Sequence, residues 1–319
     1  MEKECDMVVE ILMATYNGGK YLEEQLRSIE EQTFKHWHLT VHDDGSTDET
    51  LDVLEAFQKR MGKDKVTFRK NDVPSGSAKA NFLGLIKEAE GDYFMCCDQD
   101  DRWHINKIAM TLHRMRQMEQ RYGRDLPLLV HTDLRVVDSR LKEIHPSFHA
   151  YTNLEHRPIP SLELVQNQVT GCTMMFNNQL KQYVERIDNT DPILMHDHFL
   201  ALIACAFGKM SYIDKATIDY RQHEENSVGA QDARSLSYMW NRFKRGKEAF
   251  RMSMEDSCRQ AGYFMELYEP YFRDRRIRRL FQSYEGLYTK NKWQRIDTCL
   301  NNRFMKKGVV RKVMQIIWG

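Results

Sequence analysis

The first hundred residues alternate between short apolar runs and amphipathic segments, and this alternation restricts the possible folds more than any other feature. The strand-like runs are residues 8–14, 37–42, 66–69 and 92–97, and the segments with apolar side chains at helical spacing are residues 21–32, 49–60 and 77–90. Strand, polar loop and helix thus follow one another repeatedly. This repetition predicts an α/β fold with a mostly parallel sheet, whose two faces are covered by helices.

The second part of the chain continues the pattern less regularly. We expect a helix at 105–121, a strand at 128–140, a long loop at 141–161, a helix and a strand within 162–180, and a helix and a strand within 192–220. From about residue 235 the chain changes to long helical stretches dense in Arg, Lys and aromatic side chains. We therefore place a domain boundary near residue 230, followed by a helical extension at 231–319.

Charge is distributed unevenly between these two parts, although the whole chain carries a net charge of only +1. Residues 231–319 hold 20 Lys and Arg against 9 Asp and Glu, a net charge of +11 that leaves −10 for residues 1–230. A basic segment of this kind suits a negatively charged partner, either nucleic acid or the anionic face of a membrane.

The composition argues against several protein classes. The longest apolar stretch without a charge, FLALIACAF at 199–207, is well below the roughly 20 residues that span a bilayer. Seven cysteines, an odd number without Cys-x-x-Cys spacing, argue against a disulfide framework and a zinc ribbon. The first residues, MEKECDMVVE, do not resemble a signal peptide, so we expect a cytoplasmic protein, with the inner face of the cell membrane as an alternative location.

Conspicuous polar loops follow three of the expected strands: TYN after residue 14, DDGS after residue 42 and DQDD after residue 97. The carboxyl ends of parallel strands meet at one edge of a sheet, where the ligands of such folds bind. Asp98, Asp100 and Asp101 repel one another there, so we expect a compensating divalent metal with oxygen ligands, or a positively charged partner. The alternative is a solvated acidic turn that caps the following helix.

Five segments in order carry a resemblance to a known family. They are the opening MATYNGGKYLEEQLRSIEEQTFKHWHLTVHDDGSTDET, then GDYFMCCDQDDRW, VTGCTMMFN, MHDHFLALIACAFG and YIDKATIDYRQHEENSVG. From about residue 8 to residue 230 the chain resembles glycosyltransferase family 2, inverting enzymes of GT-A fold, and in particular its bacterial rhamnosyltransferase-like members. The resemblance implies a catalytic domain at 1–230, with a nucleotide-sugar-binding half at 1–104 and an acceptor half at 105–230.

The family resemblance also implies a reaction. A sugar would move from a nucleoside-diphosphate sugar, a UDP-sugar or dTDP-rhamnose, to a hydroxyl of a glycan or lipid-linked glycan in the synthesis of bacterial surface polysaccharide. A divalent cation, Mg²⁺ or Mn²⁺, would stabilise the departing diphosphate. Asp100 is the expected primary ligand, and by resemblance Asp98 contacts the ribose of the donor or a metal-bound water, although some transferases use cationic side chains in place of the metal.

The other donor-site candidates follow the first two strands and open the third helix. They are Ala14, Thr15, Tyr16, Asp43, Asp44, Lys79 and Asn81. The first two would approach the nucleotide with their backbone, the tyrosine would stack on the base, and the two aspartates would accept hydrogen bonds from it. The last two would reach donor phosphate or sugar. DDGSTD can equally be a turn and helix cap, and the lysine can equally be an ordinary surface residue.

Asp197, in MHDHF at the start of an apolar helix, is the candidate general base, because its surroundings can tune the pKa of a carboxylate. An N-cap role for that helix is the alternative. Family members commonly carry Glu-Asp here, whereas this chain has His196-Asp197. By resemblance, His223 approaches the metal or the diphosphate and Arg221 neutralises phosphate. The candidates for the acceptor pocket are Trp103, His196, His198 and Asn226.

Two segments of the basic extension, YFRDRRIRRLF at 271–281 and RFMKKGVVRKVMQIIWG at 303–319, place Arg and Lys among apolar side chains at helical spacing. Such segments fit peripheral membrane contact, with helices that lie in the membrane interface. They also fit helices that pack on the catalytic domain and turn a basic face to solvent.

Two other functions remain open at this point. A phosphatase of the haloacid dehalogenase type would use Asp98 and Asp100, but its motif usually lies near the N-terminus and leaves TYN and DDGS unexplained. A non-catalytic nucleotide- or nucleic-acid-binding protein would use the basic extension. No motif that reads RNA or DNA is present, so we expect no nucleic-acid partner.

Overall fold

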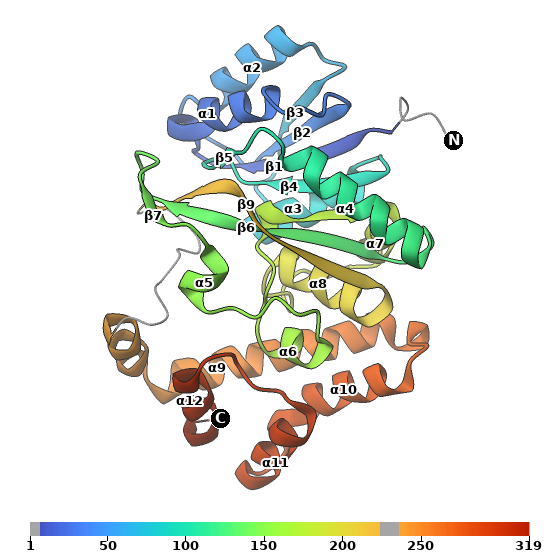
Figure 1. Ribbon diagram of the computed structural model, residues 1–319, viewed down its shortest axis with the longest axis vertical. Helices are drawn as coiled ribbons and strands as arrows, with labels where there is room; N and C mark the ends of the chain where they lie inside the picture. The colour runs from blue at the N-terminus through green and yellow to red at the C-terminus, as the bar shows by residue number, and fades with distance from the viewer. Residues whose placement is uncertain (1–6, 224–235, 319) are drawn as a thin grey trace.

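The computed structural model of the chain describes residues 7–223 and 236–318, and it confirms the predicted α/β architecture (Figure 1). Within these residues nine strands form one sheet in the order β3-β2-β1-β4-β8-β6-β9-β5, with β7 paired to β6. The strands are β1 Val9–Thr15, β2 Trp37–Asp43, β3 Val66–Lys70, β4 Tyr93–Cys97, β5 Arg102–Trp103, β6 Leu128–Val137, β7 Glu143–His145, β8 Met175–Asn177 and β9 Lys209–Arg221.

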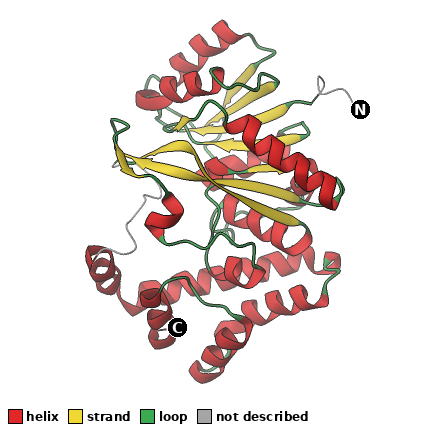
Figure 2. Ribbon diagram, viewed as in Figure 1, coloured by secondary structure: helices red, strands yellow, loops and turns green. Residues whose placement is uncertain are grey.

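Helices cover both sides of this sheet (Figure 2). They are α1 Gly19–Glu30, α2 Thr50–Met61, α3 Ala78–Glu88, α4 Lys107–Tyr122, α5 Phe148–Thr152, α6 Pro160–Val165, α7 Asn178–Val184, α8 His196–Phe207, α9 Leu236–Tyr268, α10 Arg275–Glu285, α11 Lys292–Asn302 and α12 Val309–Trp318. A short 3₁₀ turn, η1, spans Gly171–Thr173. None of the described helices is both long and apolar enough to cross a membrane.

The first four strands are parallel, as the strand–loop–helix repetition predicts. β1 pairs with β2 on one side and with β4 on the other, and β3 extends the sheet beyond β2. In this register Thr15 lies beside Asp43, and Met13 lies beside Cys97. The TYN, DDGS and DQDD loops therefore leave the sheet at one edge, as expected.

The second half of the sheet is mixed rather than parallel. β8 is antiparallel to both β4 and β6, β9 runs parallel to β6, and β5 is antiparallel to β9. The segment expected as a loop at 141–161 contains β7, α5 and the first residues of α6. Strands of two or three residues carry too little periodicity to be recognised from sequence.

Alternating side chains of the strands enter two separate cores. On β1, Ile11 and Met13 pack toward α1, α2 and α4, whereas Leu12 packs toward α3, α7 and α8. β4 divides in the same way, with Met95 on the first side and Phe94 on the second. Period-two alternation of this kind is expected of a strand that is buried on both faces.

The helices of the C-terminal extension share the second core. Phe264 of α9 packs on Phe199 and Phe207 of α8, with ring centroids 5.5 and 5.8 Å apart. The Tyr268 hydroxyl donates to the backbone carbonyl of Tyr183 at 2.7 Å. α9 is thus packed against α7 and α8. The boundary predicted near residue 230 lies outside the described residues, so the division into domains stays a prediction.

Candidate active site

The acidic loop DQDD begins where β4 ends, and its three aspartates differ in burial. Asp98 and Asp100 are partly exposed, whereas Asp101 is completely buried. Asp101 accepts the backbone N–H of Arg221 at 3.1 Å with one oxygen. Its other oxygen, Oδ2, has no N–H or O–H partner among the described residues, although the Cys172 thiol lies beside the carboxyl group. Carboxylate oxygens of Asp98 and Asp101 and the Cys172 sulfur lie within 4.8 Å of one another.

This crowding raises the pKa values of the acidic loop. Burial, and then the neighbouring charge of Asp100, raise the pKa of Asp98 to about 7. The same two causes raise the pKa of Asp101 well above its usual range. Burial also keeps the Cys172 thiol neutral by raising its pKa. A cation that reaches the partly exposed carboxylates would reverse these shifts, because it favours the ionised form.

Lys107 is a buried cation near this loop that the sequence did not single out. Its side chain has no exposed surface, and its ammonium group lies 4.8 Å from the centre of the Trp103 ring. Burial lowers the pKa of Lys107 to about 8. Neighbouring groups, which include the carboxylate of Asp101, oppose this shift. A positive charge inside the protein thus compensates part of the acidic cluster.

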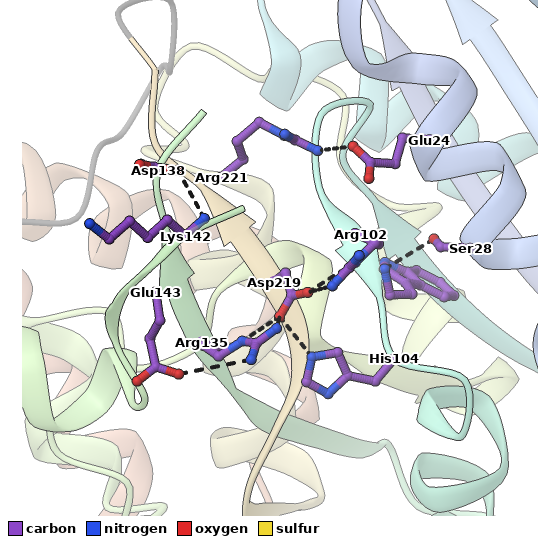
Figure 3. Close-up of polar contacts among 11 residues, drawn as sticks. Glu24, Ser28, Arg102, His104, Arg135, Asp138, Lys142, Glu143, Asp219 and Arg221 are labelled. Carbon is purple, nitrogen blue, oxygen red and sulfur yellow. Dashed lines mark hydrogen bonds and ion pairs between the residues drawn. The ribbon is translucent and has the colours of Figure 1, made fainter. Parts of the chain in front are cut away.

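His223 and Arg221 follow β9 and contact the acidic loop in different ways. The His223 Nε2 atom lies 2.7 Å from an Asp100 oxygen, and its approach to a metal or diphosphate stays a prediction. Arg221 is only 2% exposed, and its guanidinium donates to the Glu24 carboxylate at 2.5 Å (Figure 3). It also donates to the Asp100 and Ser139 backbone carbonyls at 2.8 Å. These contacts use three N–H donors of Arg221, one of them on the acidic loop, and its predicted contact with phosphate stays a prediction.

A second buried carboxylate, Asp219, holds β5 against β9 and was also missed. Arg102, Arg135 and His104 surround it at 2.6–2.8 Å (Figure 3). Burial alone would raise the pKa of Asp219, but hydrogen bonds from His104 and Arg102 lower it to about 2. This ion-pair cluster fixes the position of the strand end that carries Arg221. In the sequence, Asp219 is one polar residue of a strand without a distinguishing neighbour.

The DDGS loop uses its first aspartate to hold itself together. Asp43 is fully buried and accepts hydrogen bonds from the backbone N–H groups of Gly45 and Ser46 and from the hydroxyls of Thr15 and Ser46. Gly45 has a φ of +97°, a conformation that favours glycine. All acceptor positions of Asp43 are occupied. Its predicted hydrogen bond to a nucleotide base is therefore wrong, and the turn alternative applies.

Asp44 keeps part of its acceptor capacity. One oxygen, Oδ1, accepts from the Asn71 amide at 2.9 Å and from the Ser75 backbone N–H at 2.6 Å. The other, Oδ2, accepts from the Ser75 hydroxyl at 2.9 Å. Burial opposes ionisation of Asp44, but hydrogen bonds from Ser75, Asn71 and the Gly76 backbone N–H outweigh it and lower the pKa. The base-binding role of Asp44 stays a prediction.

The TYN loop is tied to the acidic loop by Gln99, which sequence reasoning missed. The Gln99 amide pairs with both backbone groups of Tyr16, at 2.9 Å to the N–H and 3.0 Å to the carbonyl. A Cβ at position 18 would collide with this amide, which explains Gly18. The Tyr16 side chain is 61% exposed and can stack on a ligand, whereas Ala14 and Thr15 are buried or half-buried.

Lys79 and Asn81, at the start of α3, have structural partners. The Lys79 ammonium donates to the backbone carbonyl of Ile193 at 2.5 Å. Asn81 is 4% exposed and donates to the backbone carbonyl of His42 at 3.1 Å. Both side chains join α3 to neighbouring segments, so the prediction that they reach donor phosphate or sugar is not retained.

Asp197 lies in the first turn of α8, whose N-cap is Met195, so the N-cap alternative for Asp197 is wrong. One oxygen, Oδ1, accepts from the Asn167 amide at 2.9 Å and from the His198 N–H at 2.6 Å. Among the residues that the structure describes, only the Gly171 N–H donates to the other oxygen, Oδ2, at 2.9 Å. Burial raises the pKa of Asp197 to about 6, although these hydrogen bonds oppose the shift.

The turn η1 connects Asp197 with the acidic loop. Gly171 donates its N–H to Asp197, and the next residue, Cys172, contributes the sulfur that lies beside Asp98 and Asp101. The charge of Asp197 is also one of the causes that raise the pKa of Asp98. Residues far apart in the sequence are thus brought into one cluster by a three-residue turn.

The residues proposed for the acceptor pocket are buried where the structure describes them. His196 is 3% exposed, stacks on Phe82 with ring centroids 4.3 Å apart, and has a pKa lowered by burial to about 3. His198 and Trp103 are also 3% exposed. The acceptor-pocket prediction is wrong for these three, because their side chains pack inside the protein. Asn226 lies outside the described residues.

Comparisons with known proteins agree with this arrangement. Residues 10–121 match the model of the family described as Glycosyl transferase family 2. The dTDP-rhamnosyl transferase RfbG of Shigella flexneri is 31% identical over 242 residues, which cover 71% of this chain and 76% of RfbG. The chain belongs to glycosyltransferase family 2. The resemblance stated from the sequence motifs is therefore confirmed, and the phosphatase alternative is wrong.

Solved structures support the fold expected of a family 2 glycosyltransferase. TarS of S. aureus in complex with UDP-GlcNAc has a TM-score of 0.57 at 17% identity, covering 93% of this chain and 79% of that one. Mannosyltransferase PcManGT from Pyrobaculum calidifontis in complex with GDP-Man and Mn2+ has a TM-score of 0.52 at 17% identity, covering 92% and 73%. The GT-A fold is confirmed by these neighbours.

Proposed function

We propose that this family 2 enzyme is an inverting glycosyltransferase that moves rhamnose from dTDP-rhamnose to a hydroxyl of a glycan or lipid-linked glycan. The observation that supports this proposal most directly is that η1 connects Asp197, a buried carboxylate with a raised pKa, to the acidic loop. The similarity to RfbG, over 76% of its length, supports the choice of donor. A UDP-sugar is the second candidate. The product would enter bacterial surface polysaccharide, and the reaction would take place in the cytoplasm.

The acidic loop fits a hard divalent cation, Mg²⁺ or Mn²⁺. Asp98 and Asp100 offer partly exposed carboxylates, His223 lies beside Asp100, and Asp101 Oδ2 has no N–H or O–H partner among the described residues. Oxygen atoms are the ligands that these ions prefer, whereas the neutral Cys172 thiol is a poor one. We assign Asp100 and Asp98 as the ligands. A bound cation would stabilise the negative charge on the departing diphosphate.

Asp197 acts as the general base in this proposal. At neutral pH a carboxyl group with a pKa of about 6 is mostly ionised and is still a stronger base than an ordinary aspartate. Two donors already occupy Oδ1, so the acceptor proton would go to the remaining lone pair of Oδ2. The acceptor oxygen bonds to the anomeric carbon while the bond from that carbon to the diphosphate oxygen breaks. Inversion follows, because a single displacement forms no covalent intermediate.

The donor base would be held by the loops at the sheet edge. The exposed Tyr16 ring offers a stacking surface, and Asp44 Oδ2 offers an acceptor for a base N–H. Gln99 holds the Tyr16 backbone in place from the acidic loop, so nucleotide and diphosphate sites are coupled through one amide.

A donor screen tests the function. Purified protein is incubated with Mn²⁺ and a panel of nucleotide sugars, and released nucleoside diphosphate is measured, with Asp197→Asn as the control for contaminating activity. We expect release from dTDP-rhamnose above that from UDP- and GDP-sugars. Release from a UDP-sugar alone would overturn the donor, and no release from any nucleotide sugar, with or without a glycan acceptor, would overturn the function.

A further inference from the structure

The last helix of the chain exposes a band of apolar side chains to solvent. Val309, Val313, Ile316 and Ile317 have exposed fractions of 79%, 47%, 41% and 55%. The last three follow Val309 by four, seven and eight residues, and this spacing places all four side chains on one face of the helix. Met314 is 4% exposed and packs inward. α12 therefore turns an apolar face to solvent, while its buried residues are Arg311, Met314 and Gln315.

The preceding helix continues this apolar band. Trp293 and Leu300 of α11 are seven residues apart and are 79% and 56% exposed. Leu300 and Ile316 line the same apolar pocket between the two helices. The Lys292 ammonium donates to the backbone carbonyl of Ile317 at 2.8 Å, which ties the start of α11 to the end of α12. The α11–α12 face is defined by Trp293, Leu300, Val309, Val313, Ile316 and Ile317.

The surroundings of the α11–α12 face are strongly basic. Residues 286–319 hold eight Lys and Arg and one acidic residue, Asp297, although Lys306 and Arg311 are buried. Lys292, Arg303 and Lys312 are exposed on these two helices or at their ends. α10 differs, because Asp274 and Glu269 pair with two of its arginines. The excess positive charge is thus concentrated at the end of the chain that also carries the apolar face.

We propose that the α11–α12 face binds an anionic phospholipid membrane. Apolar side chains would insert among the acyl chains, and the surrounding Lys and Arg side chains would contact the headgroup phosphates. α12 has 10 residues and is about 15 Å long, so it would lie in the plane of the interface. A protein partner would require a surface that is both apolar and acidic at matching positions. An anionic membrane offers apolar acyl chains and negatively charged headgroups over its whole surface.

The position of this face suits the proposed reaction without depending on it. α11 and α12 lie at one end of the molecule, and the nucleotide-binding half with α1 and α2 lies at the other (Figure 1). A membrane-bound enzyme would therefore extend its donor half into the cytoplasm. Of the two basic segments that the sequence suggested, 303–319 carries the membrane contact and 271–281 does not.

Vesicle flotation tests the membrane contact directly. Full-length protein is mixed at low salt with vesicles of pure phosphatidylcholine, or of phosphatidylcholine and phosphatidylglycerol at 3:1, and the bound fraction is measured. We expect binding to the anionic vesicles that weakens at least tenfold in 0.5 M NaCl, because salt screens the headgroup attraction. The double variant Val313→Glu/Ile317→Glu should lower the partition coefficient at least about tenfold, since each change removes one apolar insertion.

A matched control comes from α9. Met252 is 56% exposed, like Ile317, but lies two residues before Met254, which lines the α11–α12 pocket, so it points away from that face. Met252→Glu should leave vesicle binding unchanged.

Equal binding by wild type and the double variant, or no binding to anionic vesicles at low salt, would overturn the proposal. So would a wild-type dimer in light scattering that the double variant converts to monomer, because a second copy would then cover the face. Release of nucleoside diphosphate in solution should be unaffected by the double variant, so failure here is distinguishable from failure of the proposed function.

Discussion

Replacing Asp197 by Asn separates proton transfer from binding, because two structural effects of the change oppose each other. The NH2 group of the asparagine would face the Gly171 N–H and cannot accept its hydrogen bond. The loss of this buried hydrogen bond lowers the free energy of unfolding by about 1–3 kcal/mol. The change also removes a carboxylate whose pKa rises from 3.8 to about 6, which relieves roughly 3 kcal/mol of ionisation cost at neutral pH. We therefore expect the melting temperature to change little.

Turnover should respond very differently. A general base contributes about 10²- to 10⁴-fold, so Asp197→Asn should lower nucleoside diphosphate release in the presence of acceptor by that factor. Donor affinity, measured by calorimetry on the same preparation, should be retained, because Tyr16, Asp44 and Asp100 lie on other loops. Asn167→Ala is the matched control, since it removes one donor to Asp197 and keeps the carboxylate. Its turnover should fall less than about tenfold. Turnover of Asp197→Asn within tenfold of wild type would refute the base assignment.

Three further predictions follow from the site. Asp100→Ala should abolish the Mn²⁺-dependent part of donor binding in calorimetry, and an unchanged metal response would remove Asp100 from the ligands. Because the base acts when ionised and its pKa is about 6, turnover should be flat above that pH and fall about tenfold per unit below it; a flat profile to pH 5 would contradict this. Gly171→Ala places a Cβ 2.7 Å from His196 Nε2 and should lower the melting temperature, whereas Gly84→Ala, whose Cβ meets nothing within 4 Å, should not. Equal melting temperatures would show that His196 can move aside.

Local pattern was sufficient to predict the donor half of the fold. The strands β1, β2 and β4 and the helices α1 and α2 lie within one or two residues of the predicted ranges. Each is long enough to show its own periodicity, and each loop between them is short. β8 lies within the range 162–180 where a strand was expected, but its antiparallel direction is set by its neighbours in the sheet, and β5, with two residues, is too short for any periodicity to indicate it. The mixed second half of the sheet was therefore not predicted.

The candidate site shows the same division between local and tertiary information. The motifs indicated the acidic loop, the base candidate and His223, because residue type and order are properties of the sequence. They did not indicate which side chains already have partners: Asp43 is bound by Gly45 and Ser46 of its own loop and by Thr15. Arg221 likewise contacts Asp100, Ser139 and Glu24. Gln99 carries no charge and no motif, so its bridge to Tyr16 depends entirely on the folded geometry. The burial of His196 could not be predicted from the sequence either, which had suggested a place in the acceptor pocket.

The configuration of the reaction product tests the central claim most directly. Wild-type protein, Mn²⁺ and dTDP-rhamnose are combined in an NMR tube, with a glycan acceptor or with water as a slow acceptor, and the anomeric signal of the first product is recorded before mutarotation. A direct displacement assisted by Asp197 predicts a first product whose anomeric configuration is opposite to that of the donor, and loss of this signal with Asp197→Asn. A first product that retains the donor configuration would contradict the account, because retention requires a different arrangement of catalytic groups from the one that Asp197 and the acidic loop provide.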